Sequence, residues 1–262
     1  MGTSKGYSMP SGGEWTPLKH EATDFVKNPD EAKPEPVVSA YIRAFGGAGA
    51  FAARGNRKAA ARSRNGDSSG GGGGSGAGST RAARSTAQAV GAFIGDVARD
   101  GFAVALERLG LAELVGRPPD EVVERLLDSL AAPGTTLDAA AARHALDDIL
   151  GGLLENASSY EDLVAAFEAR VTEAGLRQFL GDFYGAYVYE LFSRDFYENW
   201  AEKVGIARAE DSLKQIEECM RSEAVLQLAG RELLTFDWRG PDAEQLAQTI
   251  MEEVLRLFEK LR

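Results

Sequence analysis

The sequence predicts an all-α fold, with a helical bundle over residues 80–262 that follows a long disordered N-terminal tail over residues 1–79. Two observations lead to this division. From Thr80 onward, apolar residues recur every three to five positions, which is the period of one buried helix face. The preceding segment is rich in Gly, Ser, Arg, Pro and Ala, so we expect it to bury too little surface to offset the chain entropy lost on ordering.

Charge divides along the chain in the same way. Residues 1–79 hold 10 Lys+Arg and 7 Asp+Glu, a charge of +3, and residues 80–262 hold 19 and 33, a charge of −14, which together give the net charge of −11. An acidic body argues against nucleic acid as its main partner, because it would repel the phosphates. One cysteine excludes an internal disulfide, and no stretch reaches the apolar length that spans a bilayer, so we expect a cytoplasmic protein that does not bind membranes.

The predicted helices begin with a stripe from Thr80 to Leu109. Three glycines weaken this stripe, so a break is expected near Asp100. The next helix starts at Pro118 and Pro119, because proline suits the first turn, where its missing N–H is not needed.

Two capping signals place the following helices. Thr136 or Asp138 caps an Ala- and Leu-rich helix that ends near "GGLL". Ser159 with Asp162 three residues later has the spacing of a capping box, in which each residue satisfies a backbone N–H of the other.

The most distinctive predicted helix is "LRQFLGDFYGAYVYELFSRDFYENWAEKVG", in which aromatic residues recur four apart. This spacing predicts a central core helix, because aromatic side chains bury large areas. The alternative is that the remaining tyrosines mark a partner-binding face, since tyrosine is enriched at interfaces. These are Tyr184, Tyr189 and Tyr197. Two more helices follow, over about 207–235 and 242–261, with "TFDWRGP" as the turn between them.

Candidate catalytic and metal-binding residues are few. The two histidines, His20 and His144, lie far apart, and His144 precedes two aspartates on a helix, where pairing with an acid is the simplest interpretation. Cys219 lies among glutamates, which raise a thiol pKa and make it unreactive. No His or Cys set has metal-ligand spacing. We therefore expect no enzymatic activity, no catalytic residue, no metal and no cofactor of its own.

The run "GGSGAGST" at residues 73–80 has the outline of a phosphate-binding loop but carries Ser79 at the lysine position. No apolar strand precedes it, although a phosphate loop joins a buried strand to a helix. We interpret the run as a flexible Gly/Ser linker.

A basic run without acidic residues extends from Val37 to Gly66. Its cations could bind nucleic acid through phosphates while Tyr41, Phe45 and Phe51 stack on bases, or they could bind an acidic protein surface, including that of this chain. The second interpretation is favoured, because so few charges are a small nucleic-acid footprint. The candidate contacts are Arg54, Arg57, Lys58, Arg62 and Arg64.

The N-terminus offers a different chemistry. A small second residue, Gly2, allows removal of the initiator methionine and exposes an α-amine with a pKa of about 7.7–8.0. Part of this amine is unprotonated and nucleophilic at cellular pH. The alternative is that the segment is simply a loose terminus.

Several of these segments together resemble the QatB family, a component of the bacterial Qat anti-phage defence system. They are the opening "MGTS", the Gly/Pro/Ser-rich and then basic leader, the run from "GGGGGSGAGST" to "LAELVGRP", and "TTLDAAAARHALDDIL". The resemblance covers the N-terminus and about residues 70–155.

The resemblance implies a non-enzymatic partner of a QueC-like enzyme, encoded beside an ATPase and a TatD-like nuclease. It further implies that the Gly2 amine accepts a 7-deazaguanine group, giving a covalent adduct, with Thr3 and Ser4 aligning the tail through hydrogen bonds. The linker would give the tail its reach. Two alternatives stay open: an unmodified structural adaptor, and a nucleic-acid sensor that uses the basic run over residues 54–64.

Overall fold

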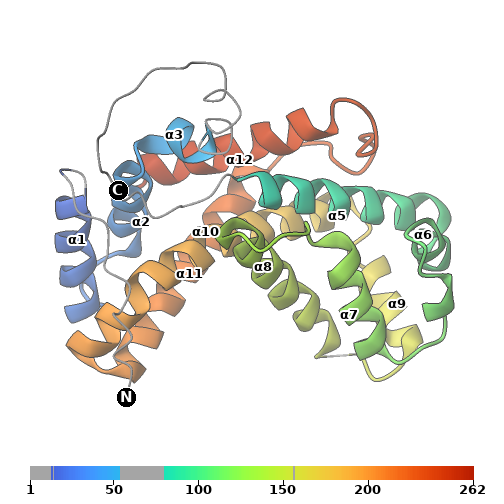
Figure 1. The fold of residues 1–262 in the computed structure, drawn as a ribbon, viewed down its shortest axis with the longest axis horizontal. Coiled ribbons are helices and arrows are strands. Elements are labelled where there is room, and N and C mark those ends of the chain that lie inside the picture. The colour runs from blue at the N-terminus through green and yellow to red at the C-terminus, as the bar shows by residue number, and fades with distance from the viewer. Residues whose placement is uncertain (1–12, 14, 54–79, 156) are drawn as a thin grey trace, which may run out of the picture.

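The computed structural model describes residue 13 and residues 15–53, 80–155 and 157–262, and these consist of helices joined by turns, without a strand (Figure 1). The expectation of an all-α helical bundle is thereby confirmed. A long helix, α10 (Glu173–Val204), lies at the centre and pairs along its length with α11 (Ile206–Gln227). The other elements surround this pair, so nearly all large apolar side chains of the described residues join one core.

Three helices precede the Gly-rich linker: α1 (Trp15–Lys27), α2 (Pro34–Ala44) and α3 (Gly47–Ala53). Each of the first two buries an apolar stripe, and Leu18, Phe25 and Ile42 are at most 1% exposed. Residues 15–53 are thus part of the folded body, where the sequence predicted a disordered tail. The two short stripes are hidden in a Gly- and Ser-rich composition, and the structure packs them against α10, α11 and α12.

The contact between α2 and the body is specific as well as apolar. The buried Tyr41 hydroxyl donates to Asp195 Oδ2 on α10 at 3.2 Å. Burial and the Asp195 carboxylate raise the pKa of Tyr41 well above its usual value. Ser39 Oγ and Arg43 Nη2 each donate to the carbonyl of Glu259 at 2.8 Å, near the end of the last helix, where the α-helix leaves its carbonyls unpaired.

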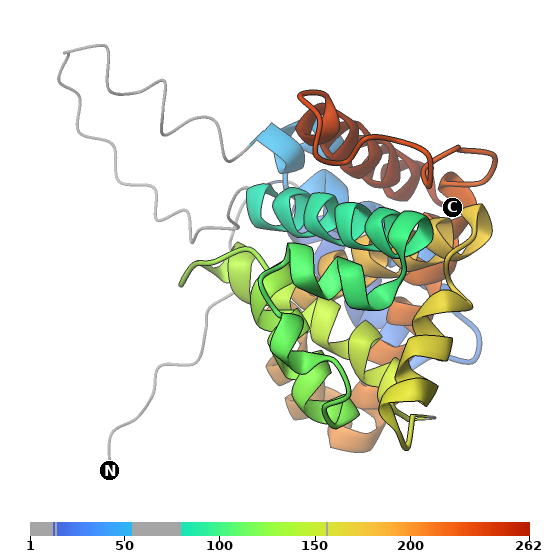
Figure 2. The same ribbon diagram turned by 90° about the vertical axis from the view of Figure 1, so that its right-hand side faces the viewer.

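The remaining helices run in chain order around the central pair. They are α5 (Arg81–Asp100), α6 (Phe102–Arg108), the 3₁₀ turn η2 (Ala112–Leu114), α7 (Pro119–Leu130), α8 (Leu137–Leu154), α9 (Tyr160–Glu168) and α12 (Ala243–Lys260). Figure 2 shows α5 between α12 on one side and α7 and α8 on the other, and α5 contacts all three. This arrangement leaves one edge of α5 for the loop that precedes α12.

Most of the predicted helix boundaries are confirmed. Gly101 breaks the first stripe with φ of +88°, Pro119 starts α7, and Ser159 with Asp162 forms the capping box. Thr136 caps α8 by accepting from Ala139 N at 3.1 Å. One boundary is wrong: α11 ends at Gln227 rather than near residue 235.

Asp138, the other candidate cap for α8, has a different role. It is 3% exposed and accepts from Ala82 N on α5 at 2.8 Å and from the Tyr187 hydroxyl on α10 at 2.7 Å. The carboxylate therefore links the starts of α5 and α8 to the central helix.

The aromatic stripe of α10 is the core that the sequence predicted. Phe192 and Phe196 stack with ring centroids 4.5 Å apart, and Trp200 is fully buried beside them. Tyr184 is also fully buried and donates to Ala247 O at 3.0 Å, so its proposed place on a partner-binding face is wrong. Tyr189 and Tyr197 are half-buried against the same core.

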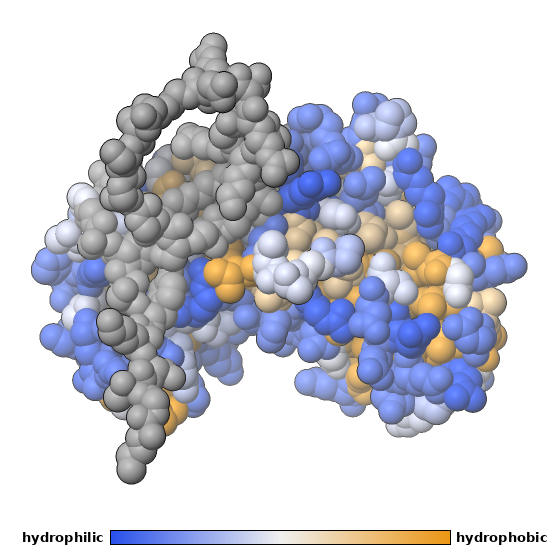
Figure 3. All heavy atoms as spheres, viewed as in Figure 1, coloured by the Kyte–Doolittle hydropathy of each residue, from blue (hydrophilic) through white to orange (hydrophobic). Residues whose placement is uncertain are grey.

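On the face shown in Figure 3, the surface of the described residues is largely hydrophilic. Its apolar areas lie mostly in the right half of the picture, where α5 to α9 lie. No helix among the described residues is both long and apolar enough to cross a membrane.

Candidate functional site

The residues that the sequence singled out for function lie mostly outside the described residues. This holds for the acceptor Gly2 with its neighbours Thr3 and Ser4, and for the whole basic set. That set comprises Arg54, Arg57, Lys58, Arg62 and Arg64. Their roles therefore stay predictions.

The aromatic residues that could stack on bases in the nucleic-acid alternative, Tyr41, Phe45 and Phe51, are described, and this role is wrong for them. Tyr41 is 0%, Phe45 8% and Phe51 3% exposed. The three rings pack edge to face at centroid distances of 5.0–6.4 Å, and Phe45 also packs on Trp15. Rings buried in the fold offer no face to a base, so these three residues do not stack on nucleic acid.

The two side chains considered for catalysis have distinct surroundings. His144 is exposed on α8, and nearby Asp148 forms its ion pair with Arg221 of α11. Burial together with Glu35 and Glu223 raises the pKa of Cys219 to about 12, in the direction predicted. Within the described part of the chain, no group of three His, Cys, Asp or Glu residues is arranged to hold a metal ion.

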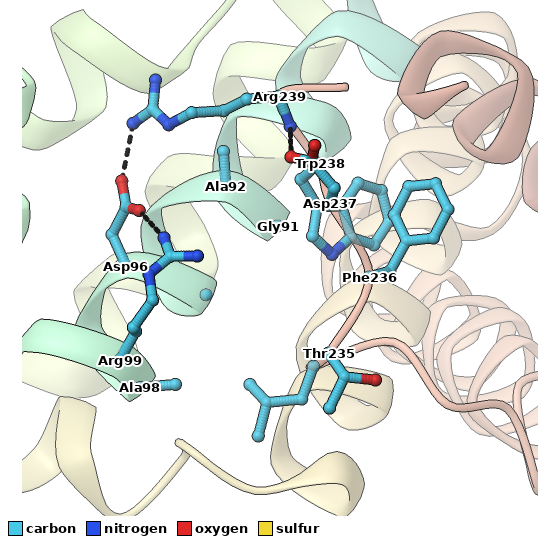
Figure 4. Close-up of a pocket in the computed structure, with 12 residues that line it drawn as sticks. Gly91, Ala92, Asp96, Ala98, Arg99, Thr235, Phe236, Asp237, Trp238 and Arg239 are labelled. Atoms are coloured by element: carbon cyan, nitrogen blue, oxygen red, sulfur yellow. Dashed lines mark hydrogen bonds and ion pairs between the residues drawn. The ribbon is translucent and has the colours of Figure 1, made fainter. Parts of the chain in front are cut away.

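A cavity of about 400 Å³ between α5 and the loop over residues 234–239 is a candidate site with largely apolar walls (Figure 4). It exists because α5 presents small residues to the loop. At Gly91 a Cβ would lie 2.3 Å from the Trp238 ring, so only glycine admits the indole there. Ala92 and Gly95 continue this small face and form one wall of the cavity.

The loop that forms the other wall is fixed in place. Glu173, at the start of α10, accepts from the backbone N–H groups of Leu233 at 2.7 Å and Leu234 at 2.9 Å. The buried Trp238 donates its indole N–H to Leu233 O at 2.9 Å. Phe236 packs edge to face on Trp238 and stays partly exposed to the cavity.

Three arginines meet on one buried carboxylate at the rim. Asp96 has a side chain only 2% exposed and accepts from Arg239 at 2.6 Å, from Arg108 at 2.9 Å and from Arg99. Figure 4 shows Arg99 and Arg239 reaching Asp96 from opposite sides. Burial by itself raises the pKa of Asp96, but the hydrogen bonds and charges of Arg239 and Arg108 outweigh it and hold the pKa below its usual value.

The lining of this cavity has the composition of a ligand-binding site. Among its described lining residues, the cavity has apolar walls, guanidinium groups and carboxylates, and neither His nor Cys. Pockets of roughly 300–1,000 Å³ with apolar walls and a few fixed polar groups are typical of ligand sites.

The sequence analysis treated "TFDWRGP" only as a turn and α5 only as a helix. A signal was present in the glycines of α5, since small residues four apart allow another segment to approach closely. No local sequence pattern, however, predicts the contact between Asp96 and Arg239, because the two residues are 143 positions apart.

Comparison with known proteins gives one family. The family model described as QatB, Qat anti-phage system associated protein QatB, matches residues 71–258. No curated protein and no solved structure matches the chain.

Proposed function

The chain belongs to the QatB family and is therefore a component of the Qat anti-phage system, and on that premise we propose that it acts without catalytic activity of its own. Its helical body binds a QueC-like enzyme, and its Gly2 amine accepts a 7-deazaguanine group. The family match supports the place of the chain in the defence system, because it covers residues 71–258 and so includes α5 to α11 and nearly all of α12. The roles of Gly2 and of the QueC-like partner are our proposal from the resemblance of the N-terminus.

The partner enzyme uses one co-substrate, ATP, to adenylate a 7-deazaguanine carboxylate, and this step releases pyrophosphate. The unprotonated Gly2 amine attacks the activated carbonyl, a C–N bond forms, the bond to AMP breaks, and the new amide nitrogen loses its extra proton to water. An α-amine with a pKa of about 7.7–8.0 is partly in the reactive form at neutral pH. Thr3 and Ser4 supply hydrogen bonds that align the tail.

The fold changes how the tail reaches its partner. Because α1 starts at Trp15 and packs on Phe45 with ring centroids 5.1 Å apart, the linker joins α3 to α5 and adds nothing to the reach of Gly2. The chain between Gly2 and Trp15 is roughly 13 residues and spans at most about 45 Å when extended. The partner's active site is therefore expected within that distance of Trp15, at the start of α1.

Mass spectrometry of the N-terminal peptide tests the proposal, with the protein expressed alone and together with the QueC-like enzyme. We expect an adduct on Gly2 that requires an intact ATP site in the enzyme. Gly2→Pro is the matched variant, because it keeps a small second residue for methionine removal but presents a hindered secondary amine. A free Gly2 in a system that still protects against phage would refute the modification and leave an unmodified adaptor.

A further inference from the structure

We infer that the cavity between α5 and residues 234–239 is a docking site for an extended peptide segment of a partner protein. The segment carries an apolar anchor side chain beside a single carboxylate. This inference rests on the proposed adaptor role and adds to it the surface that holds the partner.

The apolar walls of the cavity indicate that the bound segment carries an apolar anchor side chain. Ala92 and Gly95 leave the backbone of α5 accessible, and Leu234 and Phe236 face them with partly exposed side chains. A bulky aliphatic or aromatic side chain in this space would lose its water contact against both walls. Aromatic and aliphatic anchors in fitted pockets dominate the energetics of protein interfaces.

The exposed arginine side chains at the rim of the cavity indicate that the bound segment also carries a carboxylate. The side chains of Arg99 and Arg239 are 64% and 51% exposed, whereas Asp96, which both contact, is 2% exposed. A ligand therefore meets guanidinium N–H groups and not the carboxylate that holds them. A guanidinium has five donors in a planar fork and binds a carboxylate through two parallel hydrogen bonds.

Charge balance favours one carboxylate over a phosphate group. Arg99, Arg108 and Arg239 are matched by Asp96, Asp100 and Asp237, so the rim is close to neutral and tolerates the single charge of a carboxylate better than the double charge of a phosphate. The rest of the body is acidic, since residues 80–262 hold 19 Lys+Arg against 33 Asp+Glu. An acidic segment is therefore repelled less by this rim than by the acidic remainder of the body.

The site is organised before any ligand arrives. Gly91 and Leu233 O hold Trp238, and Glu173 holds the backbone at the start of the loop. A preformed wall spares the ligand the cost of ordering a loop, which is a large part of the cost of association.

The test measures binding of the full chain to the purified QueC-like enzyme by biolayer interferometry. Ala92→Leu fills the cavity without breaking a hydrogen bond, and alanine and leucine have similar helix propensities. Arg239→Glu reverses one charge at the rim of the cavity. Ala140→Leu makes the same alanine-to-leucine change at an exposed position on α8, away from the cavity, and is the control. Both site variants should weaken binding by about tenfold or more, and the control by less than about twofold.

A photo-crosslinking amino acid at Thr235, an exposed residue of the cavity wall, identifies the bound segment. The expected product joins Thr235 to a partner peptide with an apolar and an acidic residue side by side. Unchanged binding by both Ala92→Leu and Arg239→Glu would overturn the inference, and continued formation of the Gly2 adduct in those variants would show that the proposed function survives. If the unaltered chain neither binds the enzyme nor is modified, both proposals fail.

Discussion

Replacement of Gly185 by alanine tests a close backbone contact between α10 and α11. A Cβ on Gly185 would lie 2.6 Å from the Cα of Arg221 and 2.7 Å from the carbonyl oxygen of Met220. Both atoms belong to the backbone of α11, so no side-chain rotation relieves the contact. The Arg221 Cα would have to withdraw by about 0.8 Å to reach ordinary contact at 3.4 Å.

The magnitude follows from two opposing effects. In a helix interior, alanine is favoured over glycine by about 1 kcal/mol. Overpacking a rigid core costs about 1–3 kcal/mol, and a gap of about 0.5–1 Å forfeits a quarter to a half of the dispersion energy of the separated atoms. Since Ile216, Met220 and Ala224 of α11 are fully buried in the core, we use the upper end of this cost. The net destabilisation is about 2 kcal/mol, or about 4–8 °C in Tm.

The assay is thermal and urea unfolding followed by circular dichroism. Gly151→Ala in α8 is the matched control, because nothing lies within 4 Å of a Cβ there. It should gain about 0.5–1 kcal/mol from helix propensity alone. If Gly185→Ala also gains stability, α10 and α11 do not approach each other as described, and the packing argument fails.

Three further predictions concern other parts of the fold. Tyr41→Ala should lower the free energy of unfolding by about 3–5 kcal/mol in urea titrations, because it removes a fully buried ring, and an unchanged value would place α2 outside the core. Burial, with the nearby Glu217 and Asp148 carboxylates, raises the pKa of Glu190, so the charged form costs stability at neutral pH. Glu190→Gln should therefore raise Tm at pH 7, and the gain should vanish as the pH falls below the unfolded-state pKa of about 4.3; a pH-independent gain would contradict this. Cys219, with a pKa of about 12, should react with iodoacetamide at pH 8 more than about 100-fold slower in the native than in the urea-unfolded protein, and equal rates would refute its burial.

Much of the helical architecture could be predicted because its signals are local. The capping box at Ser159, the cap at Thr136 and the break at Gly101 each depend on residues within a few positions of one another. The aromatic spacing of α10 likewise predicted a core helix, since positions three and four apart share one face. The end of α11 was misplaced because residues 228–235 have a helical composition but form the loop that Glu173 holds.

The sequence by itself determined the fold class, the acidic body and most helix starts, because these follow from composition, helical period and caps. Only the tertiary structure decided that residues 15–53 belong to the body, since their stripes are short and gain stability from packing on α10–α12. It alone also placed Arg239 on Asp96 across 143 residues and so created the arginine-rimmed cavity. Such contacts depend on how distant helices cross, and helix crossing is set by the packing of whole side-chain surfaces rather than by any local pattern.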